Sequence, residues 1–120
     1  MDPYKLGEME QRLADLIWRH APLRTRELVE ICQQEFGWKR TTTYTMLKRL
    51  CERGLFQNNG GEITPLKSRE EFHTEQGEQF LNQSFSGSLP QFVAAFMKSK
   101  RLKPKEMEEI VRLIQEYKEE

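Results

Sequence analysis

Apolar residues in the first part of the chain recur with the period of an α-helix. They predict an amphipathic helix over about 8–20, which ends before Pro22. A second helix follows a short extended connection at 22–24, with Thr25 as its N-cap and Gly37 at its end. The inward positions of the two helices are Leu6, Met9, Leu13, Leu16 and Ile17, then Leu28, Ile31, Cys32 and Phe36.

A third helix is predicted from about residue 40 to residue 53, and its two faces differ in kind. One face is an apolar stripe of Thr43, Met46, Leu47, Leu50 and Cys51. Three consecutive threonines begin the helix, although β-branched side chains lose χ1 freedom in helices. Something other than helix propensity therefore favours the polar groups of the opposite face. These are Arg40, Thr41, Tyr44, Thr45 and Lys48, flanked by Thr42 and Arg49.

A small β-hairpin is predicted after the third helix. Residues 55–58 form its first strand, Asn59-Gly60-Gly61 its tight turn, and 62–64 the returning strand, which Pro65 ends. Three helices followed by a hairpin is the plan of a winged helix, a variant of the helix-turn-helix. The predicted fold class is therefore mainly α, with a winged-helix domain over residues 1–67.

The remaining residues, 68–120, predict three further helices that are apolar on one side. A capping box from Ser68 to Glu71 opens the first, Ser88 caps the second, and Pro104 suits the first turn of the third. A segment of about fifty residues cannot bury this much apolar surface alone, so a second copy of the chain is the simplest cover. The alternative is that these helices fold back on residues 1–67. The predicted dimer interface comprises Phe80, Phe85, Phe92, Phe96, Met107, Ile110, Val111 and Ile114.

The charge of the chain is zero in total but is divided along its length. Residues 1–69 hold twelve Lys and Arg against nine Asp and Glu, a net charge of +3, and the rest carries −3. Within 37–69, seven basic residues face only Glu52 and Glu62, a net charge of +5. Such a concentration is typical of a surface that binds phosphates, although random scatter is an alternative on charge alone.

No constellation typical of an enzyme or a cofactor site occurs in the sequence. His20 and His73 are isolated, and neither has metal-ligand spacing to Cys32 or Cys51. Both cysteines fall on apolar helix faces, which indicates buried structural thiols. No phosphate loop, nucleophile elbow or HExxH motif is found. We therefore expect no catalytic residue, metal or cofactor, in a cytoplasmic protein with reduced thiols and no membrane association.

The features that remain are a basic, hydroxyl-rich helix face and a neighbouring hairpin. Threonine and tyrosine hydroxyls bond phosphate oxygens and base edges, and arginine can grip guanine at two positions. Because an α-helix fits the major groove of B-DNA, the helix at about 40–53 is predicted to be a recognition helix in that groove. The alternative is a protein-interaction module, in which this helix meets a protein and binds no specific DNA sequence.

Three stretches of the sequence follow a known family pattern in the same order and spacing. Trp38 to Leu50 matches a Trp followed by T-hydrophobic-x-T-hydrophobic-L-x-R-L, and Arg53-Gly54-Leu55 matches its close. The other two are Glu10, Leu13, Ile17 and Trp18 in the first helix, similar to E-x-x-(V/L)-M-x-x-(I/L)-W, and Pro65-Leu66 after the wing. Over nearly its whole length the sequence resembles the penicillinase/methicillinase repressor family (the BlaI/MecI type) of small bacterial repressors.

The resemblance implies a transcriptional repressor that acts as a homodimer on palindromic operator DNA, with 68–120 as a helical dimerisation domain. Two recognition helices would read adjacent major grooves. The resemblance places Thr42, Thr45 and Arg49 at the DNA, with Tyr44 nearby. Arg40, Lys48, Arg53 and Lys67 are expected mainly to pair phosphates. The full set of predicted DNA-binding residues is Arg40, Thr41, Thr42, Tyr44, Thr45, Lys48, Arg49, Arg53 and Lys67.

Three departures from the family pattern bear on regulation and on the wing. Ala95-Phe96 stands where members controlled by a sensor protease have an Asn-Phe cleavage bond. The resemblance implies a regulatory protease as a partner, but the replacement of the asparagine argues against it. The chain lacks the C-terminal C-x-C metal site of related copper-responsive repressors. Residues 62–64 replace the usual aromatic-rich returning strand, so weaker or different contacts between the wing and DNA are expected.

Overall fold

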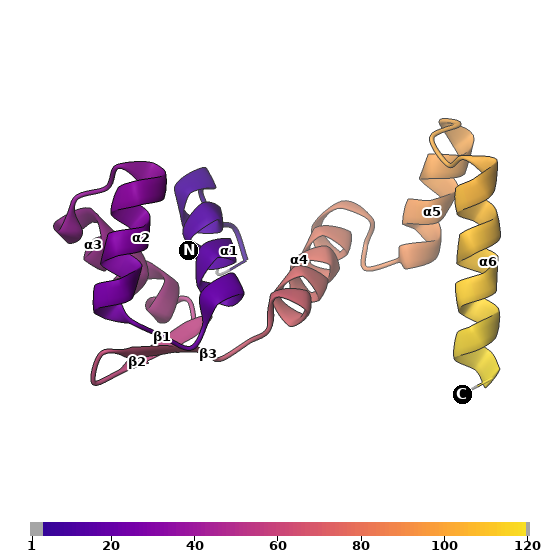
Figure 1. Cartoon of the computed structure of the whole chain (residues 1–120). Coiled ribbons are helices and arrows are strands. Elements are labelled where there is room, and N and C mark those ends of the chain that lie inside the picture. The colour runs from indigo at the N-terminus through magenta and orange to yellow at the C-terminus, as the bar shows by residue number, and fades with distance from the viewer. Residues whose placement is uncertain (1–3, 120) are drawn as a thin grey trace. The chain divides into compact units, whose positions relative to one another are not determined.

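The computed structural model describes residues 4–119, and the chain divides into two compact units, Met1–Gly77 and Glu78–Glu120. The fold is mainly α-helical with one small sheet, as the sequence predicts. In chain order (Figure 1) its elements are α1 (Glu8–His20), β1 (Leu23–Arg24), α2 (Thr25–Phe36), α3 (Arg40–Glu52), β2 (Phe56–Asn59), β3 (Glu62–Pro65), α4 (Arg69–Ser84), α5 (Leu89–Lys98) and α6 (Pro104–Glu119).

The predicted ends of the first three helices are confirmed. α1 ends at His20, before Pro22. α2 ends at Phe36 with Gly37 as its C-cap, and the φ of Gly37, 67°, lies in the left-handed region that favours glycine. α3 covers Arg40–Glu52, with Arg53 as its C-cap.

The start of α2 differs from the prediction. Arg24 is the N-cap and Thr25 is already the first helical residue. The Arg24 N–H donates to Glu27 Oε1 at 3.0 Å, and the Thr25 N–H donates to the Gly61 carbonyl oxygen at 2.9 Å. The assignment of Thr25 as N-cap is therefore wrong, because the sheet holds the chain up to Arg24 and the helix begins immediately after it.

The sheet has three short antiparallel strands in the order β1-β3-β2. β2 and β3 form the predicted hairpin, but the predicted strand bounds are wrong by one residue: β2 begins at Phe56 instead of Leu55 and extends to Asn59, and β3 includes Pro65. Gly60 and Gly61 make the turn with φ values of 58° and 94°. β1, which the sequence shows only as an extended connection, pairs Leu23 with Ile63. The first unit is thus a winged helix whose hairpin is anchored by a third strand.

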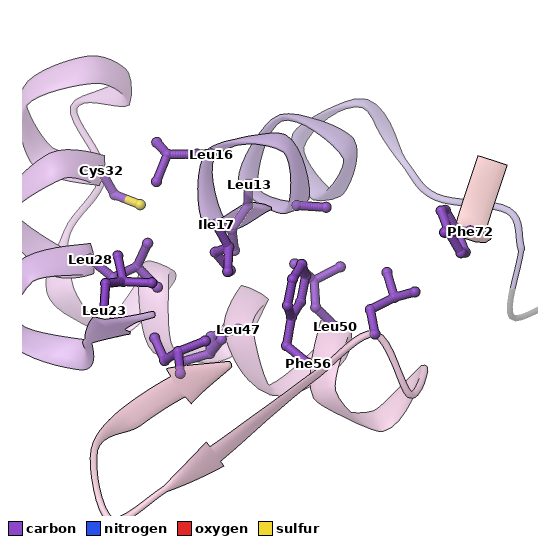
Figure 2. Packing of buried hydrophobic residues seen from close by; sticks show 13 residues of the cluster. Leu13, Leu16, Ile17, Leu23, Leu28, Cys32, Leu47, Leu50, Phe56 and Phe72 are labelled. Carbon is purple, nitrogen blue, oxygen red and sulfur yellow. The ribbon is translucent and has the colours of Figure 1, made fainter. Parts of the chain in front are cut away.

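The core of the first unit lies between its first three helices and the sheet. Figure 2 shows side chains from α1, α2 and α3 directed into one cluster with Phe56 of β2. Burying one such leucine stabilises a fold by about 1.5–3 kcal/mol. Because α3 turns Thr43, Leu47 and Leu50 inward, its opposite face points to solvent. The buried apolar residues are Leu13, Ala14, Leu16, Ile17, Leu23, Leu28, Cys32, Leu47, Leu50, Leu55, Phe56, Ile63 and Phe72.

The first half of α4 belongs to the first unit. Its predicted capping box is present, since the Glu71 N–H donates to Ser68 Oγ at 3.0 Å. Phe72 is buried with its ring centre 5.9 Å from that of Trp18, and Trp18 Nε1 donates to the Lys67 carbonyl oxygen at 2.9 Å. The division of the chain therefore falls after Gly77, later than the boundary after Lys67 expected from the sequence.

The second unit contains the end of α4 together with α5 and α6. None of its residues from 78 to 119 is buried. Four phenylalanines contact one another within it, and their ring centres are separated by 4.6 to 5.9 Å. A unit in which every described side chain keeps contact with solvent has no complete core within one chain. The four residues are Phe80, Phe85, Phe92 and Phe96.

Candidate nucleic-acid interface

α3 presents a continuous polar face to solvent on the side away from the core. Residues one turn apart contact each other along it, and the Arg40 guanidinium carbon lies 5.6 Å from the centre of the Tyr44 ring. Arg49 Nη1 lies 3.8 Å from Met46 Sδ and is otherwise open to solvent. The structure thus brings seven of the predicted DNA-binding residues together on one helix, all of them exposed: Arg40, Thr41, Thr42, Tyr44, Thr45, Lys48 and Arg49.

The threonines of α3 divide into satisfied and free hydroxyls. Buried Thr43 donates to the Lys39 carbonyl oxygen at 3.4 Å, and exposed Thr45 donates to the Thr41 carbonyl oxygen at 2.9 Å. The Thr41 and Thr42 hydroxyls have no hydrogen-bond partner among residues 4–119. Since each hydroxyl offers one donor and two acceptor lone pairs, both remain available to a partner molecule.

The N-terminus of α3 is left without a counter-charge. Its first turn has no acidic residue, and no side chain caps it. α1, α2, α4 and α6 each carry at least one glutamate in that turn. Because the helix dipole is positive at this end and Lys39 and Arg40 lie there, the start of α3 favours an anionic partner.

A groove of about 510 Å³ opens beside the start of α3. Tyr44 lines this groove. The pKa of its hydroxyl is lowered, mainly by a hydrogen bond with Thr25 and to a smaller extent by one with Arg40. This groove was not predicted from the sequence, because its walls come from α2, α3 and the hairpin turn, and the pairing of β1 with β3 places the turn beside α2. They include Arg24 and Arg26 at the start of α2, Arg40 and Tyr44 of α3, and Gly60 and Gly61 of the hairpin turn.

Arg53 does not join this surface, contrary to the sequence prediction. Its Nε lies 2.8 Å from Glu10 Oε2, and the two side chains are only 10% and 11% exposed. The pair connects the end of α3 to α1. A guanidinium that is withdrawn from water and paired with a carboxylate has little free charge for a phosphate, so this ion pair argues against the predicted phosphate contact of Arg53.

Replacing Arg53 by methionine is expected to destabilise the winged helix rather than to weaken DNA binding directly. The substitution leaves the Glu10 carboxylate buried without its partner, which costs about 2 kcal/mol or more. In thermal unfolding followed by circular dichroism, Tm should fall by roughly 10 °C. An unchanged Tm combined with a weaker dependence of DNA affinity on salt would instead make Arg53 a phosphate contact.

Lys67 is also engaged inside the first unit. Its Nζ lies 2.6 Å from Glu75 Oε2 and 5.6 Å from the centre of the Tyr4 ring. The hydrogen bond with Glu75 raises the pKa of the Lys67 ammonium group. The structure thus directs this cation toward α4, and it does not bring Lys67 together with the polar face of α3.

Cys32 and Cys51 are both free; Cys32 is buried as predicted, whereas Cys51 is only half-buried, contrary to the prediction. Burial raises the pKa of the Cys32 thiol, although a hydrogen bond with Thr43 partly opposes the effect. Burial also raises the pKa of the half-buried Cys51 thiol, and the charge of Glu52 adds to this. Both groups are therefore less ionised near neutral pH than ordinary thiols.

Both cysteines are expected to resist thiol reagents in the folded chain. Only the thiolate attacks a disulfide reagent, so a raised pKa lowers the reactive fraction at pH 8, and burial also restricts access. Reaction with an aromatic disulfide should be at least about tenfold slower in the native protein than in urea. Equal rates in the two conditions would contradict the packing described here.

The described part of the chain offers no site for a metal ion. Among residues 4–119, no group of three or more His, Cys, Asp or Glu side chains is placed to hold one. In the same residues, no helix is both long and apolar enough to cross a membrane.

Three packed helices, a strand-anchored hairpin and an exposed, basic third helix define a winged-helix DNA-binding protein. The family model for the penicillinase repressor matches residues 6–116, and the chain belongs to that family. Among curated proteins, the penicillinase repressor of Bacillus licheniformis is 25% identical over 118 residues, which cover 95% of this chain and 92% of that relative.

Family membership confirms the resemblance seen in the sequence and settles the class of protein. The members are transcriptional regulators, so the chain is a DNA-binding repressor and neither an enzyme nor a protein-interaction module alone. One similar solved structure is the solution structure of the Bacillus licheniformis BlaI monomeric form in complex with the blaP half-operator. It has a TM-score of 0.48 and 24% identity, and the match covers 56% of this chain and 87% of that chain.

Proposed function

We propose that this repressor binds palindromic operator DNA as a homodimer in the bacterial cytoplasm and blocks transcription by occupying the promoter. Each protomer inserts α3 into a major groove, and the two-fold axis of the dimer coincides with that of the operator. The observation that carries the proposal is the exposed face of α3, where cations and free hydroxyls stand beside a helix N-terminus without a counter-charge.

The residues of this face divide into two roles. Thr41, Thr42, Tyr44, Thr45 and Arg49 lie at the major groove, where hydroxyl and guanidinium groups distinguish base edges. Arg40 and Lys48 mainly pair phosphates and position the helix. Support comes from the exposure of all seven side chains and from the inward orientation of Leu47 and Leu50, which fixes the rotation of α3 about its axis.

The second unit supplies the dimer interface in this proposal. α6 exposes an apolar stripe in which Met107 is 39%, Val111 58% and Ile114 50% exposed. A surface of this kind on a small domain typically marks a protein interface, and a second copy covers it with a self-complementary stripe. Completing the interface are the half-buried Ile110 and the cluster of Phe80, Phe85, Phe92 and Phe96.

Release of the operator does not proceed through cleavage between Ala95 and Phe96 in this proposal. The bond lies inside α5, and the asparagine of protease-controlled members is absent. We therefore propose that the inducing signal releases the operator without cleavage of this bond, and we do not include a regulatory protease among the proposed partners.

Mobility-shift titration of the full chain tests the proposed function. The duplexes are a set of palindromes drawn from the region upstream of the protein's own gene, with a random-sequence duplex as control. Retardation of at least one palindrome is expected at about 50 mM salt, falling steeply toward about 200 mM because phosphate contacts release counterions. Absence of any retardation at low salt would contradict sequence-specific DNA binding.

A further inference from the structure

Three arginines from separate elements meet around the groove beside α3. Arg24 ends β1 and caps α2, Arg26 lies in the first turn of α2, and Arg40 begins α3. All three are exposed and line the same space of about 510 Å³. Because Arg40 also belongs to the polar face of α3, the groove is continuous with the surface proposed to meet the bases.

None of these three guanidinium groups forms an ion pair within residues 4–119. Other arginines of the first unit do, as in the pairs of Arg12 with Glu8 at 2.9 Å and Arg69 with Asp15 at 3.0 Å. Three positive charges that lie close together without an ion-pair partner repel one another, and a bound anion relieves this repulsion.

Carboxylates near the groove do not neutralise it. Glu30 lines the groove without pairing to an arginine, and Glu27 accepts a hydrogen bond from the Arg24 backbone N–H at 3.0 Å. Glu62 lies opposite Arg24 in the sheet register and forms no ion pair there. Among the residues that line the groove, the three arginines face the single carboxylate of Glu30, and none of the three nearby glutamates forms an ion pair with them.

The donors of the groove fit a phosphate carried by DNA. Guanidinium groups present planar sets of N–H donors that match phosphate oxygens. The first N–H of α2 is already bonded to the Gly61 carbonyl oxygen at 2.9 Å, so the side chains must supply the contacts. The hairpin cannot provide the cation, since Glu62 is the only charged residue between Phe56 and Pro65.

We propose that the groove binds a backbone phosphate of the operator, with Arg24 and Arg26 supplying the flanking contact that the hairpin lacks and Arg40 joining it to α3. The proposal rests on the proposed function, because it assigns further contacts to the same DNA. A phosphate held here positions α3 along the duplex and carries no sequence information itself.

The test compares Arg24→Gln/Arg26→Gln with Arg19→Gln in the full chain. Arg19 is a control because it is exposed and unpaired in the first unit but lines a different groove, and Arg19→Gln matches the charge change of Arg26→Gln alone. Fluorescence anisotropy gives Kd between about 50 and 200 mM salt for the duplex that the protein selects and for a random 30-bp duplex.

The double variant is expected to lower the slope of log Kd against log salt by roughly one to two per protomer, and to weaken binding at about 100 mM salt on the order of tenfold for both duplexes. Arg19→Gln should leave both quantities close to those of the wild type. An unchanged slope in the double variant, or equal losses in the two variants, overturns the phosphate site while leaving the proposed function intact. If the wild type binds neither duplex, the proposed function itself fails.

A variant in the opposite direction separates this effect from misfolding. Glu30→Gln removes the negative charge that lines the groove and should tighten binding to both duplexes roughly two- to fivefold at low salt. A damaged fold cannot produce a gain of affinity. Unchanged or weaker binding by Glu30→Gln contradicts a phosphate in the groove.

Arg26→Gln alone repeats the main test without altering a residue of β1. Its salt slope should fall by about half as much as that of the double variant.

Discussion

Replacing Ile114 by glutamate is expected to convert the proposed dimer into monomers. Ile114 is 50% exposed in the single chain, so a carboxylate at this position lies in water and leaves the monomer fold intact. In the proposed interface the same carboxylate would be withdrawn from water without a partner, at a cost of about 3 kcal/mol or more for each of the two symmetric copies. Sedimentation velocity gives the oligomeric state, and circular dichroism verifies the helix content.

The matched control for Ile114→Glu is Arg112→Gln. Both substitutions make the net charge of the chain more negative by one, but Arg112 lies on the polar side of α6, where it reaches Glu116 at 3.9 Å. Arg112→Gln should therefore remain a dimer. The interface would have to be placed elsewhere if Ile114→Glu sediments as a dimer, and a general charge effect would be indicated if both variants become monomers.

Replacing Arg49 by alanine is expected to weaken specific DNA binding by about 1–3 kcal/mol, the range for one bidentate contact to a base, or roughly 5- to 150-fold in Kd. The Arg49 guanidinium is exposed, and among residues 4–119 its side chain contacts only the sulfur of Met46, at 3.8 Å. Its removal thus leaves the core unchanged. Anisotropy titration against the selected duplex and a random duplex separates base recognition from phosphate contact.

The pattern of losses decides the role of Arg49. A larger loss on the selected duplex than on the random one supports base contact, whereas equal losses make Arg49 a phosphate contact only. Arg19→Ala serves as the control, because Arg19 is an unpaired arginine in the last turn of α1 and lines a groove that contains no residue of α3. Unaltered affinity of Arg49→Ala for both duplexes would remove this residue from the interface.

The features that depend on local periodicity could be predicted from the sequence. The inward face of α3 follows from apolar residues spaced three and four apart, and the exposure of Thr42, Tyr44 and Arg49 follows from the same spacing. The ends of helices were predictable because Gly37 and Pro22 impose backbone conformations that interrupt a helix. These rules need only neighbouring residues.

The features that the sequence did not predict depend on contacts between distant residues. β1 is a two-residue strand, too short for an alternating pattern. Because β1 pairs with β3, α2 begins after Arg24 and the hairpin turn lies beside the arginine-lined groove. Arg53 was predicted to be a free cation on a basic helix, but Glu10, forty-three residues earlier, pairs with it. Charge counts along the chain do not reveal which cations are neutralised inside the fold.

The central claim is that two copies of α3 read two half-sites related by the symmetry of a dimer. The most direct test is to measure the affinity of the full chain for its selected palindrome and for the same palindrome with five base pairs inserted at its centre. The insertion turns one half-site by about half a helical turn, since B-DNA repeats every 10–10.5 bp or so. Affinity should fall to that of a single half-site. Equal affinity for the two duplexes would contradict a dimer that reads both half-sites at once.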